Sequence, residues 1–234
     1  MFFYGVCVVV ASSIGSLFCI FNGRTTDNHY TIFKTFQASL FWMGVKVRVE
    51  NRELLDSEEP YIANHQAALD VYTMTHAWPK NCVVILKSSL KFLPGFNLCA
   101  YLCCAIFINR FNKTRAHKSI GDAEEAIIEK KRKIFIFPEG TRNIGDEMLP
   151  FKKGAFVIAK TANVPIVPCV FSSYKPFYSF AERRFEPGEV VIRILPKVSS
   201  EGKTVDELSD ECRKIMADAF IDLNKSLAGA KKTN

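Results

Sequence analysis

The run Ile134-Phe135-Ile136-Phe137-Pro138-Glu139-Gly140-Thr141-Arg142-Asn143 decides the fold class of this chain. Its first four residues are all apolar and predict a fully apolar strand. Pro138 ends that strand and Gly140 lets the backbone turn tightly, so the polar residues that follow lie on a loop at the end of the strand. Such loops are where α/β proteins display their functional side chains. The run therefore predicts a sheet protein with a candidate site at this strand end.

Short β-rich runs and helical patterns alternate along the rest of the chain. The predicted strands are 45–49, 61–63, 82–86, 106–108, 134–137, 166–170 and 190–195. The predicted helices are 68–75, 117–131, 156–161 and 205–227. The last helix begins with the capping box Thr204-Val205-Asp206-Glu207. This alternation predicts an α/β fold in which a mixed β-sheet is flanked by helices.

Two further segments are strongly apolar. Residues 1–23 carry no charge and are long enough to cross a bilayer. A cleaved signal peptide is the alternative, but no Lys or Arg precedes this run and no clear cleavage site follows it, so a retained anchor is predicted. Because Arg24 and Lys34 follow the run, the rest of the chain is predicted to be cytosolic. Segment 96–108 is too short to span and is expected to form a buried or interfacial helix and strand.

A second apolar stripe has helical spacing within residues 31–42. It fits a second membrane-associated helix or, equally well, a core helix that packs on the domain. The predicted organisation is a membrane-associated helical segment over residues 1–43, an α/β domain over residues 44–228 and a disordered tail over residues 229–234.

Charge and cysteine content exclude some classes of protein. The formal net charge of +7 indicates affinity for anionic surfaces, and twenty phenylalanines without a nucleic-acid-binding motif favour lipid over nucleic acid. The eight cysteines lie mostly in apolar runs, which predicts buried free thiols and no disulfide framework. Cys99, Cys103 and Cys104 lack a second CxxC or a His pair, so no metal site is predicted.

His65 and Asp70 form a second candidate group, in the string Asn64-His65-Gln66-Ala67-Ala68-Leu69-Asp70. A spacing of five residues rotates side chains by roughly 140° along a helix, so the two can meet only if His65 lies at the turn before the helix. Asp70 would then fix the tautomer of the ring and leave the other nitrogen to accept a proton. Free amide groups at the helix N-terminus are expected to point at the same spot.

Taken alone, each string also fits a structural histidine or an ordinary Pro-Gly turn. A base, an orienting carboxylate and the guanidinium of Arg142 together indicate acid–base chemistry on a phosphorylated molecule.

With these strings the chain resembles the glycerolipid acyltransferases, and more closely the 1-acylglycerol-3-phosphate acyltransferases. Four ordered sequence blocks of that family can be placed over residues 64–170. They are the His65 string, then Ile106-Phe107-Ile108-Asn109-Arg110, then residues 137–143 followed by Phe151-Lys152-Lys153-Gly154-Ala155-Phe156, and finally Val164-Pro165-Ile166-Val167-Pro168. The second block departs from the family pattern, because Cys104 stands where the family usually has Gly and Asn109 where it usually has Asp.

The resemblance implies a membrane enzyme of the endoplasmic reticulum whose catalytic domain covers residues 44–228. It would transfer a fatty acyl group from acyl-CoA to the sn-2 hydroxyl of 1-acylglycerol 3-phosphate (lysophosphatidic acid), forming phosphatidic acid in glycerophospholipid synthesis. Acyl-CoA is then a co-substrate, no cofactor is implied, and a phospholipid membrane is the expected partner. Two alternatives stay open: the same chemistry on another lysophospholipid, and a catalytically silent lipid-binding scaffold.

The resemblance also implies roles for individual residues. His65 would act as general base, Asp70 would hold its ring, and the acceptor oxygen would attack the thioester without an acyl-enzyme; no G-x-S-x-G nucleophile motif is present. The residues implied to bind substrate are Arg110, Glu139, Gly140, Thr141, Arg142 and Pro168. Glu139 is expected to orient Arg110 or Arg142, or to contact a glycerol hydroxyl. Lys152, Lys153 and the Gly154 amide are candidates for steadying the oxyanion.

Overall fold

The computed structural model describes residues 2–56, 60–108 and 113–230. Arg110 and residues 231–234 of the predicted tail lie outside this range. The chain forms two compact units, the first of Met1–Met43 with Trp78–Phe135 and the second of Gly44–Ala77 with Ile136–Asn234. Short 3₁₀ helices occur in both: Ile20–Asn22, Phe41–Met43, Arg52–Asp56, Thr75–Ala77 and Ser88–Phe92.

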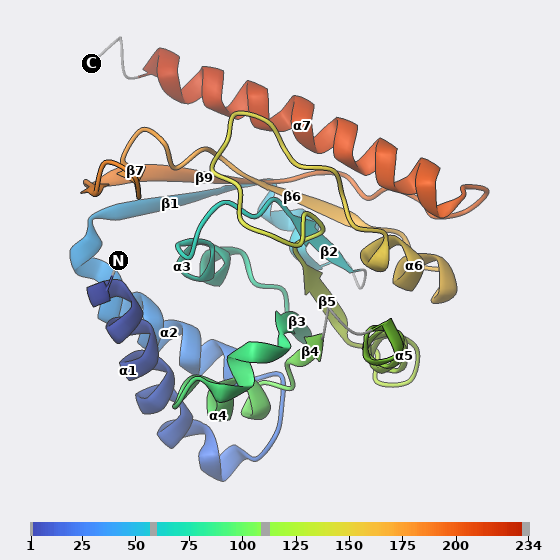
Figure 1. Cartoon of the computed structure of the whole chain (residues 1–234), viewed down its shortest axis with the longest axis horizontal. Coiled ribbons are helices and arrows are strands. Elements are labelled where there is room, and N and C mark those ends of the chain that lie inside the picture. Colours follow the sequence, from blue (N-terminus) through green and yellow to red (C-terminus); the bar gives the residue numbers. More distant parts are fainter. Residues whose placement is uncertain (1, 57–59, 109–112, 231–234) are drawn as a thin grey trace. The chain divides into compact units, whose positions relative to one another are not determined.

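The second unit contains a mixed sheet. Its strands lie in the order β1 (Val45–Glu50), β9 (Gly188–Ile194), β6 (Val167–Phe171) and β2 (Tyr61–Ala63). β1 runs parallel to β9 and β2 parallel to β6, whereas β6 and β9 are antiparallel. Helix α7 (Val205–Ala230) covers one face of this sheet and α3 (Asp70–Met74) the other (Figure 1). The α/β fold class with a mixed, helix-flanked sheet is confirmed.

The remaining elements of this unit differ from expectation in their limits. Helix α6 (Gly154–Thr161) begins two residues before the predicted start at residue 156, and α7 continues through Gly229 to Ala230. A small hairpin of β7 (Tyr178–Ser179) and β8 (Arg184–Phe185) was not predicted. Two-residue strands contain too few positions to show an alternating pattern, so the sequence carried no signal for them.

Helix α7 is positioned by its cap and its apolar face. The predicted capping box is present: Glu207 N donates to Thr204 Oγ1 at 3.2 Å, and Glu207 Oε2 accepts from Thr204 N at 2.7 Å. The side chains that pack on the sheet are buried, namely Leu208, Cys212, Met216, Phe220 and Leu223. Burial of this stripe, repeated every three to four residues, is what holds the helix on the sheet.

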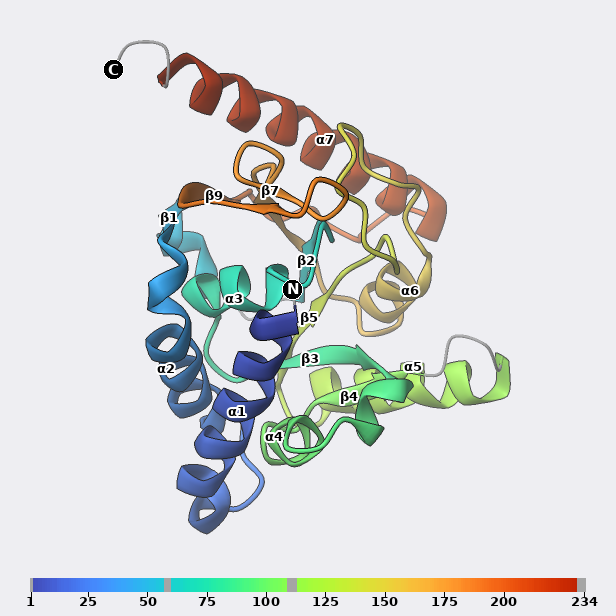
Figure 2. The same cartoon turned by 60° about the vertical axis from the view of Figure 1, so that its left-hand side comes forward.

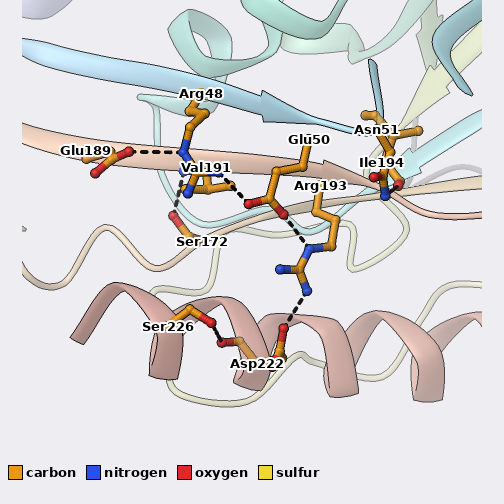
Figure 3. Close-up of polar contacts among 10 residues, drawn as sticks. All are labelled: Arg48, Glu50, Asn51, Ser172, Glu189, Val191, Arg193, Ile194, Asp222 and Ser226. Carbon is orange, nitrogen blue, oxygen red and sulfur yellow. Dashed lines mark hydrogen bonds and ion pairs between the residues drawn. The ribbon is translucent and has the colours of Figure 1, made fainter. Parts of the chain in front are cut away.

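Ion pairs reinforce the same contact (Figure 3). The Arg193 guanidinium on β9 lies between Glu50 on β1 and Asp222 on α7, with both N···O distances 2.6 Å. Burial by itself would raise the pKa of Glu50, but hydrogen bonds from Arg193 and Arg48 outweigh it and lower that pKa. Because these side chains remain partly exposed, the network contributes about 1 kcal/mol to stability and is secondary to the apolar face of α7.

Gly188 begins β9 at a close approach to Phe177. A Cβ at this position would lie against the Phe177 ring and 2.7 Å from Phe177 Cβ, and Phe177 is only 2% exposed. We expect Gly188→Ala to destabilise the protein by about 1–3 kcal/mol, because the buried ring must move. Thermal unfolding in detergent measures the loss. Gly121→Ala is the matched control, since its Cβ would meet nothing within 4 Å; equal melting temperatures for both variants would contradict the prediction.

The first unit contains three parallel strands and four helices among its described residues. β3 (Cys82–Lys87) pairs with β5 (Lys133–Ile136) on one side and with β4 (Ile106–Ile108) on the other. The helices are α1 (Phe2–Cys19), α2 (Asn28–Leu40), α4 (Phe96–Leu102) and α5 (Lys113–Ile128). α4 and β4 are the helix and strand expected within 96–108. Helix α5 is shifted toward the N-terminus relative to the predicted 117–131.

Helix α1 has two different faces. Its small residues Ala11, Ser12, Gly15, Ser16 and Cys19 are buried, and a Cβ on Gly15 would lie 3.0 Å from Ile32 Cγ1 of α2. The two helices therefore approach closely (Figure 2). The larger side chains Val10, Ile14, Leu17 and Phe18 are exposed, Phe18 by 68%. By length and composition, Tyr4–Asn22 is the one described helical stretch able to span a membrane.

The stripe in residues 31–42 divides between burial and exposure. Ile32, Phe33, Phe36 and Leu40 are buried on α2, as the core alternative predicts. Phe41 is 78% exposed and Trp42 46% exposed.

All eight cysteines are free thiols and all except Cys7 are buried. Cys104 has a φ of +60°, the left-handed conformation that suits the Gly usual at this position in the family it resembles.

Candidate active site

The imidazole of His65 and the carboxylate of Asp70 are in contact. His65 lies on the loop after β2, and Asp70 is the first residue of α3. His65 Nδ1 is 2.6 Å from Asp70 Oδ2, with Asp70 1% exposed and His65 21% exposed. Since a carboxylate only accepts, Nδ1 carries the proton and the outer nitrogen, Nε2, has a lone pair to offer. The contact expected from the sequence is therefore present, with the histidine on the more accessible side.

The Asp70 carboxylate is held by three donors. Besides the ring, Asp70 Oδ2 accepts from Gln66 N at 2.8 Å and from Ala67 N at 3.1 Å. Those amides are consequently occupied, and the expectation that free amides at this helix start point at a substrate is wrong for Gln66 and Ala67. Three N–H groups on one oxygen fix the direction of the carboxylate. Asp70 Oδ1 is buried and has no partner among the described residues.

The ring of His65 is also packed. It stacks on Phe137, with centroids 4.4 Å apart and an interplanar angle of 25°. Phe137 follows β5 directly, in the run that decides the fold. The hydrogen bond to Asp70 and the stack on Phe137 together restrict both the rotation and the tilt of the imidazole.

The main chain of His65 is tied to the loop after Phe137. His65 N donates to Glu139 Oε1 at 2.8 Å, and His65 O accepts from Asn143 N at 2.8 Å. The other carboxylate oxygen, Glu139 Oε2, accepts from Leu149 N at 2.9 Å. The pKa of Glu139 is raised by its burial, although the hydrogen bonds from the His65 and Leu149 amides partly offset this effect. Both carboxylate oxygens of Glu139, a residue that the resemblance implied to bind substrate, thus accept hydrogen bonds from backbone amides.

The neighbours of His65 anchor the same loop to the end of β6. The Asn64 side chain exchanges two hydrogen bonds with the main chain of Phe171, of 3.0 and 2.8 Å. The side-chain amide of Gln66 donates from Nε2 to Phe171 O at 3.0 Å and to Ser172 O at 2.9 Å. Asn64 and Gln66 are buried and were not singled out from the sequence. A polar residue on either side of a candidate base was the available signal for these anchors.

The other residues named from the sequence lie around this loop. Gly140 has a φ of +69°, and a Cβ there would lie 3.1 Å from Lys152 Cγ, so the Lys152 chain runs over the turn. Thr141 and Arg142 are exposed, and no ion pair joins Arg142 to a carboxylate within the described ranges. Lys153 instead pairs with Asp206 at 2.6 Å. Gly154 starts α6, and Pro168 is buried on β6 beside Ile62.

Tyr178 on the unpredicted hairpin is a further neighbour. The pKa of the Tyr178 phenol is raised, mainly by burial. The Arg142 guanidinium opposes this shift and the Asp70 carboxylate adds to it. Its phenol therefore lies within electrostatic range of both groups. Nothing in the sequence around Tyr178 could have indicated this, because its distance from the two groups depends on how the chain folds back after β6.

Two other histidines have described side chains, and both differ from His65. Burial lowers the pKa of His29 to about 4, and its Nδ1 lies 3.0 Å from Thr26 O. Burial also lowers the pKa of His76, whose Nδ1 lies 3.2 Å from Tyr72 O. Each faces a backbone carbonyl where His65 faces a carboxylate.

Comparison with known proteins places this site in a class. A family model described as "Acyltransferase" matches residues 46–172, which include His65, Asp70, Glu139 and Arg142. The fold is similar to that of the crystal structure of the 1-acyl-sn-glycerophosphate (LPA) acyltransferase PlsC from Thermotoga maritima. That similarity has a TM-score of 0.75 at 22% sequence identity and covers 95% of each chain. The family model covers more than half of the chain, so the protein is an acyltransferase.

Relatives at higher identity narrow the class. The chain is 54% identical to acl-1 of Caenorhabditis elegans over 217 residues, covering 92% of this chain and 83% of that one. It is 35% identical over 228 residues to the human 1-acyl-sn-glycerol-3-phosphate acyltransferase beta, covering 94% and 82%. The Saccharomyces cerevisiae 1-acyl-sn-glycerol-3-phosphate acyltransferase is 32% identical over 237 residues, covering 99% and 75%. The chain belongs to the 1-acyl-sn-glycerol-3-phosphate acyltransferase family.

Proposed function

We propose that this protein transfers a fatty acyl group from acyl-CoA to the sn-2 hydroxyl of 1-acylglycerol 3-phosphate and releases phosphatidic acid and CoA. The observation that carries the proposal is the hydrogen bond between His65 and the buried carboxylate of Asp70. It leaves the other imidazole nitrogen, Nε2, with a lone pair that can accept a proton. Family membership supports the same substrates.

The chemical steps follow from this pair. His65 Nε2 removes the proton from the acceptor hydroxyl while the oxygen attacks the thioester carbonyl carbon. The resulting tetrahedral oxyanion collapses, the C–S bond breaks, and the imidazolium returns its proton to the CoA thiolate. Asp70 stabilises the transient imidazolium, because its charge lies 2.6 Å from Nδ1. The histidine ends in the protonation state in which it began.

The acceptor phosphate is bound by the loop that follows Phe137. Arg142 is exposed and not engaged by a described carboxylate, so its guanidinium can form two parallel hydrogen bonds to phosphate. Gly140, Thr141 and Arg110 complete this group by family resemblance. Lys152, lying over Gly140, is placed better than Lys153 to steady the oxyanion, because Lys153 is paired with Asp206.

Arg142→Ala is expected to raise the KM for lysophosphatidic acid by about 10- to 100-fold, because a bidentate charged contact to phosphate is lost. Initial rates with radiolabelled acyl-CoA and varied acceptor measure the change. Arg142→Lys, which keeps the charge but not the fork, should recover part of it. Arg52→Ala removes another exposed arginine and is the control. A KM equal to that of the parent would exclude Arg142 as a phosphate ligand.

The apolar surface of the first unit binds the protein to a membrane, as its family is membrane-associated. Large exposed side chains gather on this unit, among them Leu17, Phe18, Phe21, Phe41 and Phe92. Such an area is costly in water and matches the bilayer interior. The proposed organisation is a membrane segment over residues 1–43 followed by the catalytic domain, facing the cytosol at the endoplasmic reticulum.

A panel of acceptors tests the function directly. Purified protein in phospholipid–detergent micelles is given radiolabelled acyl-CoA with lysophosphatidic acid or with lysophospholipids that carry choline or glycerol headgroups. Lysophosphatidic acid is expected to give the highest kcat/KM. A preference for another headgroup would replace the acceptor, and no transfer to any acceptor would favour the lipid-binding scaffold.

A further inference from the structure

Both polar groups of the His65 main chain bind one turn of the neighbouring loop. The amide donates to Glu139 and the carbonyl accepts from the Asn143 amide, each at 2.8 Å. Arg142 lies between those two partners in the sequence. The main chain of the candidate base is therefore bound by a short segment, residues 139–143, and this segment also contains the candidate phosphate ligand.

Glu139 carries this link through its carboxylate. It is 3% exposed, and its two oxygens accept from two amides, His65 N at 2.8 Å and Leu149 N at 2.9 Å. The Leu149 peptide is fixed in turn by α7, because Arg213 donates to Leu149 O at 3.3 Å and to Met148 O at 2.9 Å. The carboxylate thus joins the His65 loop to Leu149, ten residues further along its own loop, and α7 holds the Leu149 peptide in turn.

We propose that Glu139 is a positioning residue that sets the distance between the histidine base and the phosphate-binding turn. An acceptor whose phosphate is bound by Arg142 then presents its hydroxyl to His65 Nε2 at a fixed separation. Glu139 itself touches no substrate: a carboxylate next to phosphate would repel it, and both of its oxygens are already engaged. This inference rests on the proposed function.

The chemistry of the position requires a carboxylate. A glutamine has one acceptor oxygen, so its NH2 group would face either His65 N–H or Leu149 N–H, donor against donor, in a buried place. One of the two segments must then move. Displacement of a reacting group by about 1 Å can cost about 10²-fold in rate, so even a small shift of the loop is visible in kcat.

The decisive experiment is a double-mutant cycle on lysophosphatidic acid. Glu139→Gln is expected to lower kcat about 10²-fold in the parent. In an Arg142→Ala background, where the phosphate no longer sets the register, the same change should lower kcat by less than about 5-fold. Glu139→Asp keeps two acceptor oxygens and should retain more activity than Glu139→Gln. Additive losses in the cycle would overturn the proposal, because they would mean that Glu139 acts independently of the phosphate contact.

A phosphate-free acceptor separates positioning from simple loss of structure. With 1-monoacylglycerol, which has no phosphate for Arg142 to bind, Glu139→Gln should again lower the rate by less than about 5-fold. Equal losses on both acceptors would show a general structural defect and overturn the proposal. Glu147→Gln, an exposed glutamate in the same loop, is the matched control. If the parent itself transferred no acyl group to lysophosphatidic acid, the proposed function would fail, and not only this inference.

Discussion

His65→Ala is expected to lower kcat for acyl transfer by about 10³- to 10⁴-fold, the upper part of the range typical of a lost general base. The imidazole is the group in contact with the buried carboxylate, and it retains a partly exposed edge. Without it, the acceptor hydroxyl must lose its proton to water during the attack. Phosphatidic acid formed from radiolabelled acyl-CoA in single-turnover experiments measures the remaining rate of chemistry.

The folded structure should tolerate this change. Asp70 still accepts from Gln66 N and Ala67 N, and His65 is one of the more exposed members of its loop. Unchanged circular dichroism would confirm that activity is lost for chemical reasons. His76→Ala removes a half-buried imidazole from the same unit and serves as the control. Retention of a tenth or more of the parental kcat by His65→Ala would remove His65 from the mechanism.

Asp70→Asn is expected to lower kcat by about 10²- to 10⁴-fold and also to destabilise the protein by about 1–3 kcal/mol. If the amide oxygen takes the place of Oδ2, it can accept from the three N–H groups, but the NH2 then lies in the buried position of Oδ1, which has no partner within the described part of the chain. In the reverse orientation, the NH2 faces three donors. Either way the ring loses the charge that stabilises its protonated form.

Two readouts distinguish the chemical effect from the structural one. Thermal unfolding gives the stability loss, and kcat measured well below the melting temperature gives the catalytic loss. Asp210→Asn, at an exposed position of α7, should change neither. Wild-type kcat in Asp70→Asn would mean that the carboxylate only shapes the loop.

The sequence predicted the fold where burial imposes a pattern. The seven strand predictions all correspond to strands within a few residues. A strand buried on both faces, such as β6, is apolar along its length, and a half-buried strand, such as β1, alternates apolar and charged residues. The capping box of α7 was readable because Thr204 and Glu207 contact each other across three residues. The His65–Asp70 contact was readable for a similar reason: only one placement of the turn lets the two meet.

What the sequence could not provide depends on tertiary contacts. The partners of Glu139 lie 74 residues before it and 10 residues after it, and both are backbone amides, which look the same at every position. The family resemblance implied that Glu139 contacts substrate or orients Arg110 or Arg142, whereas in the structure both of its carboxylate oxygens accept from backbone amides. The Lys153–Asp206 pair and the approach of Tyr178 are of the same kind. Each required knowledge of which loops fold next to one another.

The stack of His65 on Phe137 ties architecture to chemistry. Phe137 directly follows β5, and its ring also contacts Phe171 with centroids 6.4 Å apart. One half-buried aromatic side chain thus packs against the core residue Phe171 and also stacks on the ring of the candidate base. Anyone who redesigns this interior for thermostability, choosing side chains by volume alone, would be altering the enzyme's reactive centre without touching a polar atom.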